Sequence, residues 1–257
     1  MSSNQSTEYL FDHLVIMARD SLDELSNIFT SQGFQLTALA HHNLGSSNRL
    51  IMLKSSYIEL LGWEKEKQTQ RAEIAHQPIG LDALVFRTDD ANACYRQLKE
   101  AGFAVNPVQD LSREGDFMGN KVLVEFKTVR FSEQPIPGLR IYFCEHLTPD
   151  YVWQKQWLTH PNKTQDLQKI TIVSPNIKET ATRFQGLLGL ADSQLKFLQD
   201  CVQISLPNIN LWIQAQGSPK GVSIERVYLN QSALDPVDFI IDHHFLTHTH
   251  PSLGTHL

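Results

Sequence analysis

An acid and a histidine open an apolar segment near the start of the chain. The segment FDHLVIMARD, residues 11–20, begins with Asp12 and His13 and ends at Asp20. A histidine at the mouth of a strand can bind a metal, carry a proton, or cap an edge by bonding a neighbouring carbonyl group. The segment alone does not decide among these roles.

A second group of polar side chains lies in HHNLGSSNRL, residues 41–50. His41, His42, Asn48 and Arg49 bring hydrogen-bond donors and acceptors into a short connection between two apolar segments, and such connections commonly hold ligands. Arg49 can clamp a substrate carboxylate through two parallel hydrogen bonds, and Asn48 can orient it. These residues are therefore candidates for substrate binding. The alternative is a polar hairpin with surface histidines.

Composition restricts the class of protein. The chain has 257 residues, of which 41% are apolar and 19% charged, and it carries a net charge of -6. Phosphate binding needs a concentrated basic face, and the sequence has none, so nucleic acid is not expected as a partner. A small-molecule ligand is expected instead.

The compartment is inferred from features that the sequence lacks. The first ten residues do not form a signal peptide, and no segment approaches the roughly 20 apolar residues that cross a bilayer. We therefore expect a cytoplasmic protein without a membrane partner. The three cysteines are widely spaced, which favours reduced thiols over disulfides or a zinc site (Cys94, Cys144 and Cys201).

A strand, helix and three-strand unit recurs along the chain. In its first copy the strand at 11–20 precedes a helix at 21–33, and three short strands follow (35–42, 48–55 and 56–63). The same order begins again at 79, with a strand, a helix that ends before Gly102, and later strands at 121–131 and 138–146. A third copy opens at 167, and a fourth is cut short after the strand SIERVYLNQ, residues 223–231.

These βαβββ repeats, the strand opening DHLV, the HHNLGSSNRL loop, YIELLG and FCEHLTPDYVW together resemble the vicinal oxygen chelate superfamily, and more narrowly its glyoxalase-like group. The resemblance covers residues 9–153 well and 167–230 by pattern. It implies an α+β fold in which two βαβββ modules form a half-open barrel, with a third, degenerate module. We divide the chain into a paired domain at 1–150, a linker at 151–166 and a truncated module with its tail at 167–257.

The resemblance also implies a divalent metal in the barrel, bound by the first and last strands of each module. His13 and Glu59 occupy these positions in the first module. An imidazole and a carboxylate suit Zn, Fe, Ni or Mn. In the alternative without a metal, His13 caps a strand and Glu59 is an exposed acid.

The second module departs from this pattern. Alignment of the two modules puts Ala83 at the position of His13 and Tyr142 at that of Glu59, so Tyr142 is expected to face a substrate. His146 has the same strand parity as Tyr142 and can supply a third ligand. Two histidines and one carboxylate would form a facial triad with open positions. Alternatively, His146 lies in a solvated loop.

The remaining segments carry weaker signals. In the third module Lys169 replaces the histidine and Asn210 the glutamate, so no metal is expected there. The linker aromatics are expected to pack on the barrel (Tyr151, Trp153 and Trp157). The histidine-rich C-terminus is expected to be flexible and able to take up metal without physiological meaning (His243, His244, His248, His250 and His256).

The sequence leaves several functions open. The first is a metal-dependent enzyme of the lyase, isomerase or dioxygenase type, with Glu59 as the catalytic carboxylate. The second is a metal-free protein that binds or sequesters a small molecule in the same barrel. A structural protein that uses the unfinished sheet for assembly is a third.

The unfinished fourth repeat predicts an uncovered sheet edge. Either the C-terminal stretch folds back over it, with Phe239, Ile240, Ile241 and Phe245 as contacts, or the edge pairs in a homodimer. We expect the homodimer, because two-fold pairing is the commonest way to cover such an edge.

Overall fold

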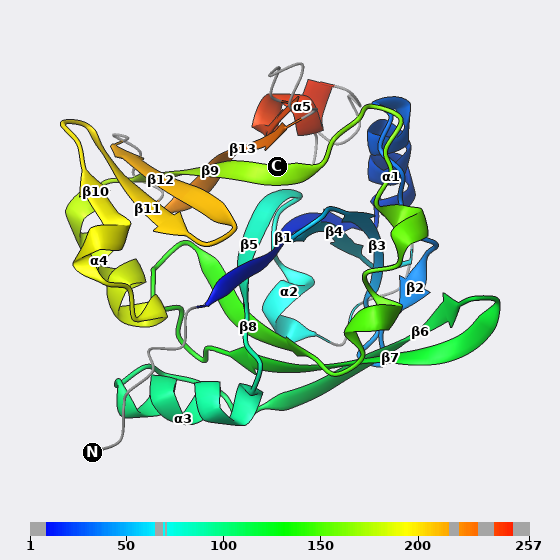
Figure 1. Cartoon of the computed structure of the whole chain (residues 1–257), viewed down its shortest axis with the longest axis horizontal. Helices are drawn as coiled ribbons and strands as arrows, with labels where there is room; N and C mark the ends of the chain where they lie inside the picture. The colour runs from blue at the N-terminus through cyan, green and yellow to red at the C-terminus, as the bar shows by residue number, and fades with distance from the viewer. Residues whose placement is uncertain (1–8, 65–68, 70, 216–220, 231–238, 249–257) are drawn as a thin grey trace.

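The computed structural model describes residues 9–64, 69, 71–215, 221–230 and 239–248. Figure 1 shows a curled sheet beside a second, smaller sheet. None of the described helices is long and apolar enough to cross a membrane. The fold is a mixed α+β arrangement, as the sequence predicts.

The first sheet has eight strands and curls into a nearly closed barrel (Figure 1). Its spatial order is β2 (Ala40–His41), β3 (Ser47–Met52), β4 (Tyr57–Gly62), β1 (Leu10–Arg19), β5 (Gly80–Arg87), β8 (Arg140–His146), β7 (Asn120–Arg130) and β6 (Gln109–Phe117). Strands β1 and β5, which open the two modules, pair antiparallel at the centre. The two modules therefore build one continuous sheet.

The strand registers agree with the alignment of the two modules. His13 pairs with Tyr57 across the parallel β1 and β4, which puts Glu59 two residues further along β4. Ala83 pairs with Arg140 across the parallel β5 and β8, which puts Tyr142 two residues further along β8. Ala83 and Tyr142 thus occupy the positions that correspond to His13 and Glu59.

Side-chain alternation separates the inside of the barrel from its outer face. On β1, Val15 and Met17 belong to the inner apolar cluster, whereas Leu14 and Ile16 belong to the cluster that packs against the helices. Both faces of the strand are buried, which accounts for its nearly continuous apolar sequence. His13 shares the inward parity of Val15.

Helices cover the outer face of the barrel. Helix α1 (Leu22–Ser31) and helix α3 (Ala91–Glu100) each follow the first strand of a module. Both carry an apolar stripe, and the side chain of Asp90 caps α3 by accepting a hydrogen bond from the Ala93 N–H at 2.9 Å. A short helix, α2 (Ala72–Ala75), precedes β5.

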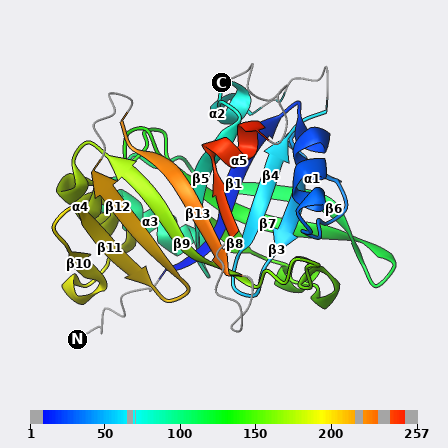
Figure 2. The same ribbon diagram turned by 90° about the horizontal axis from the view of Figure 1, so that it is seen from above.

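The second sheet lies beside the barrel, as Figure 2 shows from above. Its order is β10 (Leu195–Phe197), β11 (Cys201–Leu206), β12 (Ile209–Ala215), β9 (Asp166–Ser174), β13 (Ser223–Asn230) and β14 (Phe239–Asp242). Helix α4 (Ile177–Leu188) packs on it, and a single turn, η3 (Asp192–Gln194), leads into β10. One apolar core runs through both sheets and their helices.

The register of the second sheet corrects one sequence assignment. Lys169 pairs with Asn210 across the parallel β9 and β12, as His13 pairs with Tyr57 in the barrel. With Lys169 at the histidine position, Trp212 and not Asn210 corresponds to Glu59. The sequence assignment was displaced by two residues along β12, because short apolar strands can be aligned in more than one register. Tryptophan is not a metal ligand, so the expectation of no metal in this module is unaffected.

The linker packs on the barrel, as expected. It contains two short turns, η1 (Pro149–Tyr151) and η2 (Lys155–Trp157). The Trp153 ring lies 5.7 Å from the Tyr57 ring and 4.4 Å from the Arg87 guanidinium. Tyr151 packs on Phe117 with ring centroids 5.1 Å apart, and Trp157 borders the inner cluster.

The chain's own C-terminal stretch covers the edge of β13. Strand β14 pairs antiparallel with β13, and helix α5 (His243–His248) follows. Phe239 and Phe245 pack against Phe34 and Phe29 of the first module. The prediction of a flexible end is therefore wrong for residues 243–248, while His250 and His256 lie outside the described residues. The homodimer was expected because the edge of β13 would be open, and since β14 covers this edge, that reason no longer holds.

Candidate functional site

The site is built around a buried aspartate–histidine pair on β1. Asp12 is fully buried, and its Oδ2 lies 2.7 Å from His13 Nδ1. A carboxylate at this distance keeps the proton on Nδ1 and leaves the Nε2 lone pair free. His13 therefore presents its Nε2 to the inside of the barrel.

Two side chains approach this nitrogen, and a third holds one of them in place. His13 Nε2 lies 3.6 Å from Glu59 Oε2 and 3.1 Å from the Tyr142 hydroxyl. Asn48 donates from Nδ2 to Glu59 Oε1 at 2.8 Å, which fixes the carboxylate. Glu59 is only 7% exposed, so the alternative of a solvent-facing acid does not describe it.

Neighbouring charges keep Glu59 ionised. Burial alone would raise its pKa, but the adjacent His13 imidazole, the Asn48 hydrogen bond and Arg71 lower it below its usual value. Burial likewise raises the pKa of Tyr142, and there the nearby arginines do not outweigh it, so the phenol keeps its proton. The site thus combines a carboxylate with a neutral hydroxyl donor.

These groups line a small cavity inside the barrel. Its volume is about 30 Å³, which is room for a water molecule or an ion. The lining residues come from six strands and one loop (His13, His42, Asn48, Leu50, Tyr57, Glu59, Leu111, Arg113, Phe126, Thr128, Tyr142 and Cys144). We call this space the inner cavity.

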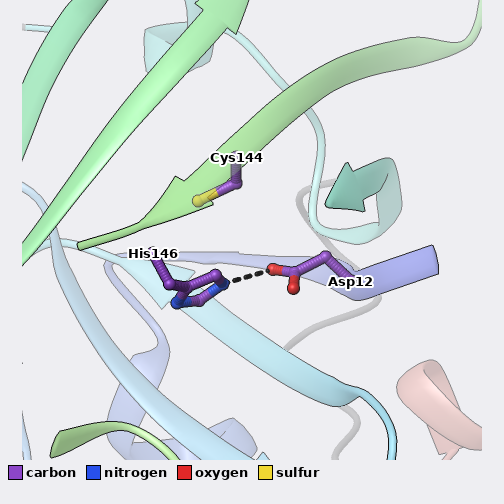
Figure 3. Close-up of side chains that lie close together, drawn as sticks. All are labelled: Asp12, Cys144 and His146. Atoms are coloured by element: carbon purple, nitrogen blue, oxygen red, sulfur yellow. Dashed lines mark hydrogen bonds and ion pairs between the residues drawn. The ribbon is translucent and has the colours of Figure 1, made fainter. Parts of the chain in front are cut away.

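Asp12 also binds two further side chains. Arg87 donates from Nε to Asp12 Oδ1 at 2.6 Å, and His146 Nε2 lies 2.8 Å from Asp12 Oδ2 (Figure 3). Burial would raise the pKa of Asp12, but the two histidines lower it well below its usual value. Asp12 is the common partner of His13, His146 and Arg87.

The structure places His146 against Asp12, outside the lining of the inner cavity. Its Nε2 bonds Asp12, and His146 is not among the residues that line the cavity with His13 and Glu59. The inward parity holds, but β8 extends beyond the cavity at this point, so the expected facial triad is not formed. His146 is not in a solvated loop either, because it packs on Trp153 with ring centroids 4.8 Å apart.

Asp12, Cys144 and His146 also form a compact group, with ligand atoms within 4.8 Å of one another (Figure 3). Burial raises the pKa of the Cys144 thiol well above its usual value. The Asp12 carboxylate already accepts hydrogen bonds from two histidines and an arginine. We interpret this group as the support of His13 rather than as a second cation site.

The HHNLGSSNRL segment divides between the two faces of the sheet. Asn48 and His42 line the inner cavity. His42 Nδ1 lies 2.9 Å from the Ser46 hydroxyl, and burial lowers its pKa to about 3, so the ring is neutral. Asn48 and His42 therefore lie where a ligand can contact them.

The other two residues of this segment lie elsewhere. Arg49 follows Asn48 on β3, so strand alternation turns it to the outer face, where it donates to the Thr37 carbonyl and lines a different pocket beside α1. His41 is 56% exposed and bonds Ser47. Neither residue lines the inner cavity, which removes the basis for the carboxylate clamp expected of Arg49.

One arginine of the inner cavity, Arg113, is not predicted from the sequence. Arg113 lies on β6, whose sequence QDLSREGDF contains too many charges to be recognised as a strand. The one available signal was the spacing of Leu111 and Arg113, two residues apart, which puts both side chains on the same face of β6 as it pairs with the apolar β7. Without β6, nothing in the sequence placed this side chain inside the barrel.

A larger cleft of about 1080 Å³ adjoins the site. Tyr142 lines both the cleft and the inner cavity, and the guanidinium carbons of Arg130 and Arg140 each lie 5.5 Å from the Tyr142 ring centroid. Arg130 pairs with Glu73 at 2.5 Å, and Arg140 pairs with the buried Asp82. Tyr142 therefore forms the wall between the two spaces.

The donor set fits a divalent metal at His13 and Glu59. The two atoms that face each other are an imidazole nitrogen freed by a carboxylate on its other side and an ionised carboxylate oxygen, the arrangement typical of metal-binding histidines. Asn48 Oδ1, on the same cavity, is buried without a hydrogen-bond partner among the described residues. Nitrogen and oxygen donors of this kind suit Zn, Fe, Ni or Mn.

The fold and site together define a barrel of two paired βαβββ modules with a polar centre on the inner face of β1 and β4. The profile of the glyoxalase-like domain matches residues 11–188. The chain therefore belongs to the glyoxalase-like domain family, and the resemblance to the vicinal oxygen chelate superfamily is confirmed. No curated protein matches the chain.

Solved structures share the fold. A hypothetical protein from Staphylococcus aureus superposes with a TM-score of 0.70 and 16% identity over 88% of this chain and 92% of its own. A mutant of 4-hydroxymandelate synthase from Streptomyces coelicolor gives 0.54 and 13%, over 97% of this chain and 75% of its own. A fusion of a xylose isomerase-like TIM barrel with 4-hydroxyphenylpyruvate dioxygenase gives 0.55 and 14%, over 89% of this chain and 38% of its own.

Proposed function

We propose that this protein is a small-molecule enzyme of the lyase, isomerase or dioxygenase type, with its reactive centre at the inner cavity. One observation carries the proposal: His13 Nε2 and Glu59 Oε2 face each other 3.6 Å apart, while Asp12 holds the other nitrogen of His13. The names of two similar structures, a synthase and a dioxygenase, support an enzyme.

The residues of the cavity have separate tasks in this proposal. A divalent ion bound by His13 and Glu59 would polarise a substrate oxygen as a Lewis acid. Asp12 keeps the Nδ1 proton in place, and Asn48 holds Glu59 in position to accept a proton from a substrate carbon or hydroxyl. Tyr142, which keeps its proton, donates a hydrogen bond to a substrate oxygen.

The cleft beside Tyr142 provides the route for the substrate. The inner cavity is too small for more than a few atoms, whereas the cleft can hold a small organic molecule. Because Tyr142 lines both spaces, a substrate that enters from the cleft meets the Tyr142 hydroxyl and accepts its hydrogen bond.

A metal-free binding protein is the second candidate. Module two supplies Ala83 and Tyr142 where the family pattern has metal ligands, and the site is surrounded by four arginines that favour an anion (Arg71, Arg113, Arg130 and Arg140). In this case His13 and Glu59 bind the ligand directly.

Metal content distinguishes the two candidates. The full chain is purified in a background in which the five C-terminal histidines are replaced by glutamine, and its metal is measured by mass spectrometry. We expect about one divalent ion per chain, and its loss in the His13→Ala, Glu59→Ala double variant. The cells are grown with Zn, Fe, Ni and Mn. If the protein with intact His13 and Glu59 then carries much less than one metal ion per chain, the metal-free binding protein is favoured.

An exposed pair of the same residue types provides the control. His41 Nδ1 and Glu64 Oε1 lie 3.7 Å apart on the surface. The His41→Ala, Glu64→Ala double variant should keep its metal. Equal loss of metal in both double variants would show that the ion is not specific to the inner cavity.

A further inference from the structure

A buried guanidinium in the inner cavity has no anionic partner. Arg113 is only 9% exposed and lines the cavity together with His13 and Glu59. Among the described residues its side chain forms no hydrogen bond or ion pair, and its Nε is buried without a partner. Buried polar groups of native proteins are nearly always satisfied, so this exception needs an explanation.

The other arginines around the site differ from Arg113 in having a carboxylate partner, although Arg130 Nε is likewise buried without a hydrogen-bond partner among the described residues. Each of them has a carboxylate within contact distance: Arg71 and Arg130 share Glu73, and Arg140 pairs with Asp82. Glu59 does not form an ion pair with Arg113, because its Oε1 accepts a hydrogen bond from Asn48 and its Oε2 faces His13.

The charges around the cavity leave room for one anion. Five arginines and four carboxylates lie in and around it, which leaves one positive charge in excess (Arg71, Arg87, Arg113, Arg130 and Arg140 against Asp12, Glu59, Glu73 and Asp82). A buried charge without a counter-charge is strongly unfavourable. Burial correspondingly lowers the pKa of Arg113, against the opposing effect of Tyr57 and Glu59.

We infer that Arg113 binds the carboxylate group of the substrate, so that the natural ligand of this site is a small organic acid. The inference rests on the proposed function in placing the reacting atoms at His13 and Glu59. A guanidinium offers two parallel N–H donors that match the two oxygens of a carboxylate. The inner cavity, at about 30 Å³, has the size of such a group and not of a whole substrate.

A second unsatisfied group points in the same direction. Asn48 Oδ1 is a buried acceptor without a partner on the same cavity. A ligand with a carboxylate toward Arg113 and a hydroxyl group that donates to Asn48 Oδ1 would satisfy both groups. The reacting carbon would then lie beside the carboxylate, within reach of Glu59.

Sodium formate, the smallest carboxylate, tests the inference. Its dissociation constant is measured at fixed ionic strength from the NMR line width of ¹³C-formate, on the full chain as purified and after removal of metal by a chelator. We expect saturable binding that is about 10- to 100-fold weaker in Arg113→Gln, as for the loss of a hydrogen bond to a charged group. Formamide, which is neutral, should not compete.

A surface arginine serves as the matched control. Arg96 on α3 is exposed, and Arg96→Gln should bind formate as the unchanged protein does. Arg113→Lys, which keeps the charge but not the paired donors, should lie between the two. If Arg113→Gln does not fold, crystals of the unchanged protein soaked in formate should show the anion on Arg113. Equal formate binding by Arg113→Gln, no binding at all, or formate bound elsewhere would overturn the inference.

The same samples separate this inference from the proposed enzyme. Formate binding through Arg113 in a protein without metal at His13 and Glu59 would leave the anion site standing and reject the metal enzyme. The opposite outcome is also possible: stoichiometric metal that is lost in the His13→Ala, Glu59→Ala variant, together with formate binding that does not depend on Arg113. It would support the metal enzyme and reject the anion site.

Discussion

The side chain of Asn208 holds the backbone of Phe11 by two hydrogen bonds. Asn208 Nδ2 donates to the Phe11 carbonyl at 2.7 Å, and the Phe11 N–H donates to Asn208 Oδ1 at 3.0 Å. Asn208 lies in the hairpin between β11 and β12 of the second sheet, and Phe11 directly precedes Asp12 and His13. The degenerate module thus fixes the strand that carries the site.

We expect Asn208→Ala to destabilise the protein by about 1–3 kcal/mol, because the buried N–H and C=O of Phe11 lose their partners. The free energy of unfolding in urea measures the effect. The control is Asn120→Ala, which removes an exposed side chain with one long hydrogen bond of 3.4 Å to the Met118 carbonyl. Equal stability of the two variants would show that the second sheet does not support β1 through Asn208.

Asp12→Asn tests how His13 is oriented. The amide cannot hold the Nδ1 proton as the carboxylate does, so we expect metal affinity to fall about 10- to 100-fold, as for other partners of metal-binding histidines. The variant should also lose about 2 kcal/mol or more of stability, because Arg87 and His146 lose the buried charge they contact. Competition with a chelator measures the affinity.

The control for Asp12→Asn is Asp110→Asn. Asp110 pairs with Lys127 at 2.7 Å but is 82% exposed, and such surface pairs contribute little to stability. Because the pKa of Asp12 is depressed in the folded protein, its contribution to stability is present above the ordinary carboxyl pKa and is lost as the pH falls below it. This acid-labile part should be absent from Asp12→Asn. An unchanged metal affinity would reject the role of Asp12 in orienting His13.

The sequence predicts the scaffold of the site better than its charges. Repeats, strand parity and the family resemblance were enough to predict the paired barrel, and the structure brings His13, Glu59 and Tyr142 together. These predictions succeed because β1, β4 and β8 are apolar on both faces, so a polar residue on them is conspicuous.

The remaining site residues depend on information that the sequence does not contain. Arg113 lies on a charged hairpin strand whose inner face is defined only by its pairing with β7. Arg49 and Asn48 are neighbours of similar polarity, and only the register of β3 decides which of them faces inward. His146 has the expected strand parity, but its side chain bonds Asp12 instead of facing the inner cavity. This contact joins residues 134 positions apart, so the local sequence does not reveal it.

His42→Gln tests the dependence of stability on pH. Burial lowers the pKa of His42 to about 3, against about 6.5 for an unfolded histidine, with Glu59 opposing and Arg71, Arg113 and Arg130 reinforcing the shift. Between these values the unfolded chain binds one more proton than the folded one, so the free energy of unfolding falls as the pH falls. The slope is about 1.4 kcal/mol per pH unit for one proton.

We expect His42→Gln to remove this slope between about pH 6.5 and 4.5, the range above the carboxyl titrations. His160, whose pKa burial also lowers, contributes equally to both proteins and cancels in the difference. The exposed His41→Gln is the control and should keep the slope. Parallel curves for His42→Gln and the unchanged protein would contradict a neutral, buried His42.

Gly138→Ala tests the contact between the barrel and the second sheet. Gly138 has a φ of +90°, and a Cβ at this position would lie 2.6 Å from the Val222 carbonyl oxygen, which precedes β13. Gly119 has a φ of +80° but no atom within 4 Å of its Cβ position, so Gly119→Ala meets only the backbone strain, about 1 kcal/mol. We expect Gly138→Ala to be destabilised by at least about 1 kcal/mol more than Gly119→Ala, because the backbone of Val222 must also shift. Thermal unfolding of the two variants measures the difference, and equal melting temperatures would mean that the second sheet yields at this contact without cost.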